Sequence, residues 1–142
     1  MMLKIFENKA TGGKGNPADL DYVFRAFLNE AISIAEIIEW TERVIRDTDY
    51  LLPEIIYDVA AMNKKTATRD QVRDEFERFR TRADTSKDMD GVLRRIGYAR
   101  EKSLFTRPRR EHTPASKQTL RYLKSSRKDV ARFKKVFPGR TL

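Results

Sequence analysis

The sequence predicts an all-α fold: a single-domain bundle of about five helices that ends in a basic C-terminal helical arm. A short strand could precede the bundle at the N-terminus. Three observations lead to this fold class. Apolar residues recur at three- and four-residue spacing, the period of one helix face. Residues that cap helix starts stand before these segments. The 142 residues suffice for one buried core but not for two independent domains and a linker.

The chain divides into three parts along its length. Residues 1–15 form an N-terminal strand and loop segment, with the strand at residues 2–6 and a glycine-rich loop after it. Residues 16–104 form the helical body. Residues 105–142, which we call the basic arm, contain a proline-flanked hinge and a C-terminal helix.

A helix start at Asn16 predicts the first helix, over about residues 17–30. Asparagine accepts hydrogen bonds from free backbone N–H groups, and Pro17 fits the first helical turn, where its missing N–H costs nothing. Apolar residues then follow at helical spacing: Leu20, Phe24, Phe27, Leu28 and Ala31. One face of this helix should therefore be buried.

A capping-box pattern from Ser33 to Glu36 predicts the start of the second helix, because each side chain satisfies a free backbone N–H group. Its apolar stripe consists of Ile34, Ile37, Ile38, Val44 and Ile45. Trp40 and Thr41 are expected on the flank of this stripe. The helix should end within the polar segment 46–49.

Three more helices complete the predicted body. The third begins near Pro53 and ends near Asn63. The fourth follows a second capping-box pattern, from Thr68 to Gln71, and the fifth covers about residues 89–103.

The basic arm begins with a segment that cannot be helical through both of its prolines. Thr113 then caps a helix that has Pro114 in its first turn. A break could occur at the serine pair 125–126, and residues 138–139 should end the helix. The pattern leaves open whether the arm packs on the body or extends from it.

Charge is unevenly placed along the chain, whose net charge is +9. Residues 1–63 hold 6 Lys/Arg against 11 Asp/Glu, a net −5, whereas residues 107–142 hold 12 against 2, a net +10. The 43 residues between them hold 12 against 8, a net +4. The molecule should therefore have an acidic half and a basic end.

The residue inventory argues against catalytic and metal chemistry. The chain has no cysteine and one histidine, His112, so a transition-metal centre would depend on carboxylates alone. We interpret His112 as an exposed residue of the hinge, a poor position for a serine hydrolase site. We therefore predict a non-enzymatic protein with no cofactor and no metal site.

Nothing in the composition predicts secretion or a membrane span. Residues 1–14 lack the apolar run of a signal peptide, and no stretch approaches the roughly 20 apolar residues of a membrane span. The lack of cysteine gives no sign of an oxidising compartment. We therefore expect a cytoplasmic protein. The apolar seam of its C-terminal helix, formed by Leu120, Leu123, Val130 and Phe137, is too narrow for deep insertion into a membrane.

The cations of the basic arm recur at helical spacing. Steps of 4, 3, 4 and 7 residues separate Lys117, Arg121, Lys124, Lys128 and Lys135. On one continuous helix these side chains would share a face, where their mutual repulsion favours an anionic partner. The predicted nucleic-acid contacts are Arg107, Arg109, Arg110, Lys117, Arg121, Lys124, Arg127, Lys128, Arg132 and Lys135.

Aromatic side chains are interleaved with these charges at Tyr122, Phe133 and Phe137. Such rings can stack on the bases of single-stranded nucleic acid. In an amphipathic helix they more often belong to the core, and that is the interpretation we favour.

The segment Ala31 to Ile45, followed by Leu52 to Ala60, resembles small α-helical bacterial immunity proteins. The resemblance covers residues 20–62. It implies an inhibitor that binds a toxin tightly, often through an acidic surface, and the basic arm departs from this pattern. The residues it points to are Glu36, Glu39, Trp40, Glu42, Asp47 and Asp49.

Two functions therefore follow from the sequence. The first is a binding protein whose basic arm engages a polyanion, above all nucleic acid through phosphate contacts with little base specificity. The second is an immunity-type inhibitor or adaptor, which binds a protein through the second and third helices or docks the basic arm on an acidic protein. A further option is that the basic arm meets the acidic body of its own chain or of a second copy.

Overall fold

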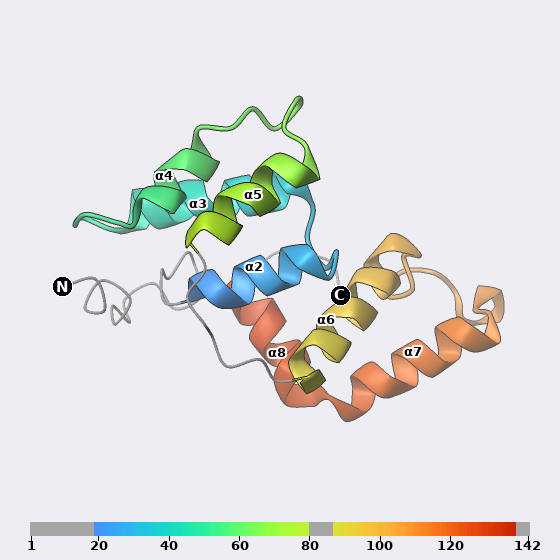
Figure 1. Cartoon of the computed structure of the whole chain (residues 1–142). Helices are drawn as coiled ribbons and strands as arrows, with labels where there is room; N and C mark the ends of the chain where they lie inside the picture. Colours follow the sequence, from blue (N-terminus) through green and yellow to red (C-terminus); the bar gives the residue numbers. More distant parts are fainter. Residues whose placement is uncertain (1–18, 80–86, 139–142) are drawn as a thin grey trace.

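The protein is all-α over the residues that the computed structural model describes, 19–79 and 87–138 (Figure 1). These residues form seven α-helices and one 3-10 helix, with no strand among them. The elements are α2 (Leu20–Leu28), α3 (Ile34–Asp47), α4 (Glu54–Ala60), α5 (Arg69–Phe79), α6 (Lys87–Glu101), η2 (Arg109–Glu111), α7 (Pro114–Ser125) and α8 (Arg127–Val136). The expected strand at residues 2–6 and the helix start at Asn16 lie outside the described residues.

Helix α2 lies between two groups of helices (Figure 1). In one group, α4 packs against both α3 and α5; in the other, α6 packs against α7 and α8. Helix α2 contacts α3 and α6, and its Phe24 ring stacks on Phe76 of α5, with centroids 4.7 Å apart. Seven of its nine residues are buried, so α2 is the centre of the core.

Local hydrogen bonds confirm three of the predicted helix starts. The Ser33 hydroxyl accepts from the Glu36 N–H at 3.1 Å, and the Glu36 carboxylate accepts from the Ser33 N–H at 2.9 Å. Thr68 and Gln71 form the same reciprocal pair, at 3.2 and 2.9 Å. Thr113 caps α7 as predicted. These starts depend on residues three apart in sequence, which is why the pattern alone revealed them.

The buried face of α3 is wider than its sequence pattern suggested. Trp40 and Thr41, expected on the flank of the apolar stripe, are both fully buried. The physical reason is that α2 and α4 both pack on α3 and cover more of its circumference than one partner helix would.

A close approach between α6 and the turn after α2 depends on glycine. Glu30 adopts a φ of 61° in this turn, and a Cβ atom added to Gly97 would lie 2.7 Å from the Glu30 carbonyl oxygen. Any larger residue at Gly97 would therefore push α6 away from the turn.

Two arginines, Arg25, which is buried, and Arg100, which is half-buried, connect these elements further. Arg25 bonds Asp90 of α6 at 3.3 Å, and Arg100 bonds Glu36 of α3 through two contacts, at 2.5 and 2.9 Å. Each arginine is mostly shielded from water, with 8% and 21% of its side chain exposed. These pairs orient α6 against α2 and α3.

The basic arm packs on the body, which answers the alternative left open by the sequence. The arm breaks at Ser126 into α7 and α8, and Phe133, Val136 and Phe137 of its last turns are buried in the common core. The Phe137 ring lies 6.5 Å from the ring of Tyr22 in α2. Phe133 and Phe137 are thus core residues, as favoured from the sequence, and the bundle includes α7 and α8 beside α2–α6.

No helix in the described ranges is both long and apolar enough to cross a lipid bilayer.

Candidate nucleic-acid interface

A positively charged depression of about 610 Å³ lies between η2 and α7. We call it the cationic hollow. Its lining consists of Arg109, Arg110, His112, Lys117, Leu120, Arg121 and Lys124. Five of the ten predicted nucleic-acid contacts are therefore gathered in one place.

The chain conformation around Thr113 brings the two walls of the cationic hollow together. After the turn of η2, His112 and Thr113 are extended, with ψ values of 130° and 164°, and α7 then begins. A ring nitrogen of His112 lies 3.1 Å from the Arg107 carbonyl oxygen, a contact that holds the hinge in a compact turn. On α7, Lys117, Arg121 and Lys124 occupy one face because they are four and three residues apart.

The charges of the cationic hollow are not balanced locally. Among the described residues no carboxylate lines it, and none of its arginines and lysines forms an ion pair. Glu111, which lies between two of the lining residues in sequence, is exposed and is not part of the lining. Like charges one turn apart on α7 repel each other, so a bound anion would stabilise this surface.

A second depression, of about 330 Å³, adjoins the first along α7. We call it the apolar hollow. Its lining consists of Phe105, Leu120, Leu123, Lys124, Arg127, Val130, Ala131 and Lys134. Leu120 and Lys124 belong to both hollows, so a chain molecule could run from one into the other.

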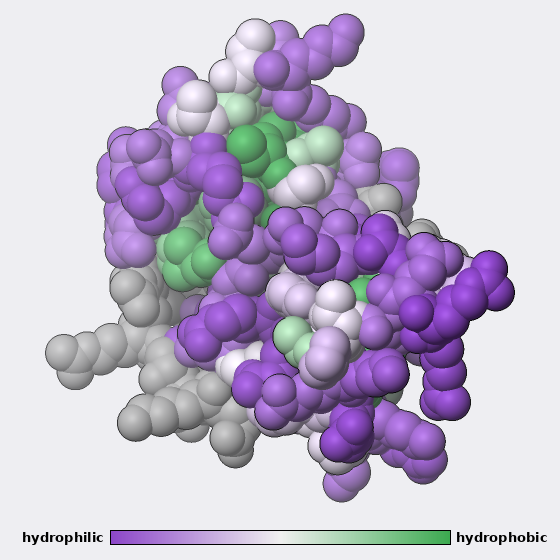
Figure 2. Space-filling view, turned by 90° about the vertical axis from the view of Figure 1, so that its right-hand side faces the viewer, coloured by the Kyte–Doolittle hydropathy of each residue, from purple (hydrophilic) through white to green (hydrophobic). Residues whose placement is uncertain are grey.

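The end of the molecule that carries α7 is predominantly hydrophilic. Figure 2 views the molecule from the right-hand side of Figure 1, and most side chains in its lower half are strongly hydrophilic, with a small apolar area between them. This matches the exposure of Arg109, Arg110, Lys117, Arg121 and Lys124, all of which face solvent.

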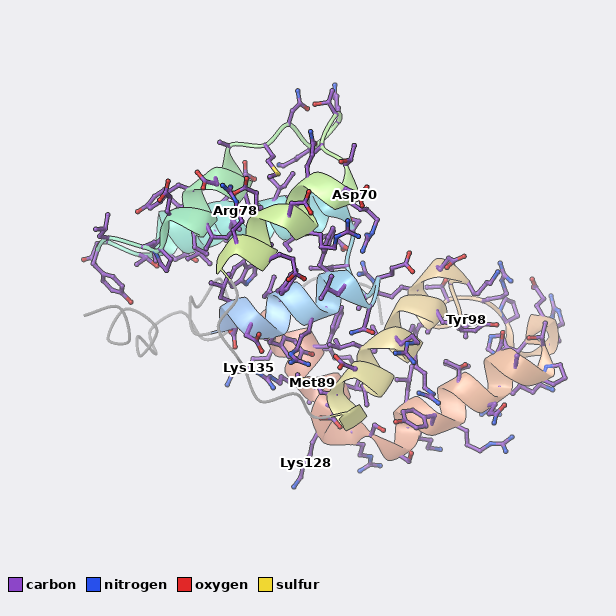
Figure 3. The ribbon with its side chains drawn as sticks, in the orientation of Figure 1. Asp70, Arg78, Met89, Tyr98, Lys128 and Lys135 are labelled. Atoms are coloured by element: carbon purple, nitrogen blue, oxygen red, sulfur yellow. The ribbon has the colours of Figure 1, made fainter. Side chains whose placement is uncertain are left out.

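The break expected as an option at the serine pair 125–126 occurs at Ser126, where ψ is 44°, so the cationic stripe, which required one continuous helix, ends there. Beyond the break, Lys128 extends away from the molecule, whereas Lys135 lies beside α2 (Figure 3). Neither lines either hollow in the described structure. Arg107 is exposed and also lies outside both linings.

Arg132 faces the body of its own chain. Its guanidinium lies over the Tyr22 ring, 4.1 Å from the centroid, and donates to the Met89 sulfur at 3.7 Å. Burial raises the pKa of the nearby Asp19, and the positive charges of Arg132 and Lys135 partly oppose this rise. Arg132 thus contacts the body through an aromatic ring and a sulfur atom, and the charge of Lys135 acts on the Asp19 carboxylate.

Seven residues of the two linings were not among the predicted contacts: Phe105, His112, Leu120, Leu123, Val130, Ala131 and Lys134. Phe105, His112, Leu120 and Lys134 are separated in sequence, and only the fold of the hinge against α7 and α8 brings them together. The hinge prolines were a signal that the chain could turn back here. The direction of the turn was not readable from the pattern.

The acidic residues predicted for the alternative function are largely engaged within the fold. Glu36 pairs with Arg100, and Lys64 contacts both Glu39 and Glu42, at 3.9 and 3.0 Å. The carboxylate of Asp47 lies 3.5 Å from the Arg46 guanidinium, and Asp49 is exposed. Trp40 is fully buried, so its ring is not presented to a partner.

Comparison with known proteins adds no functional assignment, because no family model, no curated protein and no solved structure matches the chain. Within the described ranges, no group of three or more histidine, aspartate or glutamate side chains is arranged to hold a metal ion. The functional argument therefore rests on the two hollows.

Proposed function

We propose that this protein binds nucleic acid in the cationic hollow, through contacts to phosphate groups. The observation that carries the proposal is the convergence of five arginines and lysines, from η2 and α7, on a surface that no described carboxylate lines. Arginine and lysine form strong, charge-assisted hydrogen bonds to phosphate oxygens. Phosphates are common to every sequence, so we expect little base specificity.

The immunity-type function has weaker support. An inhibitor that docked through α3 would have to separate Lys64 from Glu39 and Glu42, or leave them paired beneath the partner. Breaking such ion pairs reduces the favourable free energy of binding to a basic partner. The cationic hollow needs no such rearrangement.

A salt titration tests the proposed function directly. Binding of labelled duplex and single-stranded oligonucleotides is measured by fluorescence anisotropy from about 50 mM salt upward. Five phosphate contacts predict a slope of log affinity against log salt of about −4.5 for a duplex and about −3.5 for a single strand. No binding at low salt, or binding that ignores salt, contradicts the proposal.

A pair of matched double variants separates the cationic hollow from net charge. Lys117→Gln with Lys124→Gln removes two charges from the hollow and should weaken binding at least about tenfold, with a slope lower by about 1.4 to 1.8. Lys65→Gln with Lys128→Gln removes the same charge from exposed positions outside the lining. Equal losses for the two variants would mean that net charge alone drives binding.

A further inference from the structure

The cationic and apolar hollows adjoin each other and differ in the types of residue that line them. Leu120 and Lys124 line both, and beyond them the lining changes from arginine and lysine to Phe105, Leu123 and Val130. Lys124, Arg127 and Lys134 place three positive charges around the apolar hollow. The occupant that fits this surface has an anionic part next to a flat or apolar part.

A nucleic-acid duplex meets only half of this requirement. Its phosphates would fill the cationic hollow, but its bases are paired and stacked inside the helix. The apolar side chains of the apolar hollow would then face the charged backbone of the duplex. This contact is unfavourable, because apolar groups cannot replace the water that hydrates the phosphates. An unpaired strand differs, since each nucleotide offers a phosphate and an exposed base side by side.

We propose that the natural occupant is single-stranded nucleic acid, with its phosphates in the cationic hollow and an unpaired base in the apolar hollow beside Phe105. This inference rests on the proposed function and specifies its substrate class. Phe105 is half-buried, with part of it packed against the core and part lining the hollow. A ring fixed in this way is a stacking platform, and stacking of this kind tolerates any base.

Lys124 has a particular place in this arrangement. It is the one cation among the described residues that lines both hollows. It is therefore positioned for the phosphate that links the nucleotide in the cationic hollow to the one whose base enters the apolar hollow. Arg127 and Lys134, which line the apolar hollow but not the cationic hollow, fit the next phosphate along the strand.

Three labelled ligands of about 16 nucleotides test the inference with the full-length protein: a thymine strand, an abasic strand and a duplex. The abasic strand keeps every phosphate but carries no bases. We expect the thymine strand to bind about tenfold more tightly than the abasic strand at equal salt. The duplex should also bind more weakly than the thymine strand.

Two variants of the apolar hollow locate the effect. Phe105→Leu keeps an apolar side chain but removes the ring, and Ala131→Leu fills the hollow from an exposed position on α8. Each should lower affinity for the thymine strand several-fold and leave affinity for the abasic strand unchanged. Tyr57→Leu, a change of an exposed aromatic residue on α4, serves as the matched control and should alter neither.

The outcomes separate this inference from the proposed function. If thymine and abasic strands bind alike, with the expected salt dependence, the base site is refuted while phosphate binding stands. If no oligonucleotide binds, both fail. Binding to phosphatidylserine vesicles that requires Phe105, without binding to any strand, would assign the same surface to an anionic lipid and also refute the inference.

Discussion

The acidic side of the molecule and its basic arm carry their charges in different ways. Opposite charges are close together at α3 and α5: Lys64, in the turn after α4, contacts Glu42 of α3 at 3.0 Å, and Arg73 contacts Asp70 within α5 at 2.9 Å. In the cationic hollow, the described arginines and lysines form no ion pair. The charge of the first surface is partly neutralised within the fold, whereas no ion pair among the described residues offsets the charge of the second.

This difference teaches more about function than net charge does. The residues 1–63 have a net charge of −5, which suggested a docking surface, yet many of these carboxylates already have cationic neighbours. An exposed ion pair contributes little to stability, and it also leaves little charge for binding. A group of like charges without ion-pair partners contributes most to the free energy of binding an anion.

The largest expected change in stability tests whether the basic arm is part of the hydrophobic core. Phe133→Ala should lower the free energy of unfolding by about 3–5 kcal/mol, because a fully buried ring is replaced by a cavity. Urea denaturation measures this, with Phe76→Ala, at the junction of α2 and α5, as the matched change. A loss below about 1 kcal/mol for Phe133 alone would show that the arm is only loosely attached.

The next effect distinguishes a half-buried acidic residue from an exposed one. Glu36→Gln should lower stability by about 3 kcal/mol, because Arg100 then keeps a charge with only 21% of its side chain exposed. Glu42→Gln, which affects an exposed pair with Lys64, should cost less than about 1 kcal/mol. Thermal and urea unfolding of both variants measure the two losses. Equal losses would show that the half-buried pair of Glu36 and Arg100 contributes no more to stability than the exposed pair.

The smallest expected effect is the change in stability when one positive charge is removed, and it has opposite signs on the two surfaces. Lys64→Gln should lower stability slightly, since it removes the partner of two carboxylates. Arg121→Gln should raise stability by about 0.2–0.5 kcal/mol for each neighbouring cation it relieves on α7. Both differences, measured by urea unfolding at low ionic strength, should shrink at about 1 M salt, where charges are screened within about 3 Å. A loss of stability in Arg121→Gln would show that its charge is paired.

Much of the fold was predictable because helix starts depend on near neighbours in sequence. The pairs Ser33 with Glu36 and Thr68 with Gln71 lie three residues apart, and both form as expected. The burial of Trp40 was not predictable, since it depends on which helices pack on α3. The apolar pattern indicates one buried face, but not its full width.

The candidate site was predictable in part for the same reason. Lys117, Arg121 and Lys124 lie within two turns of one helix, so their common face followed from the spacing. The continuation to Lys128 and Lys135 failed because the backbone breaks at Ser126 and α8 takes its own direction. The apolar hollow as a whole was not predicted, although Lys124 and Arg127 of its lining were among the predicted contacts, because Phe105 joins α7 and α8 only through the fold.

The sequence by itself determined the helical period, the helix starts and the excess of positive charge in the last 36 residues. These properties depend on local hydrogen bonds and on composition. Only the tertiary structure decided which cations face solvent together and which, like Arg132, rest on the body. That choice depends on how Phe133 and Phe137 anchor α8 in the core, which no short-range pattern specifies.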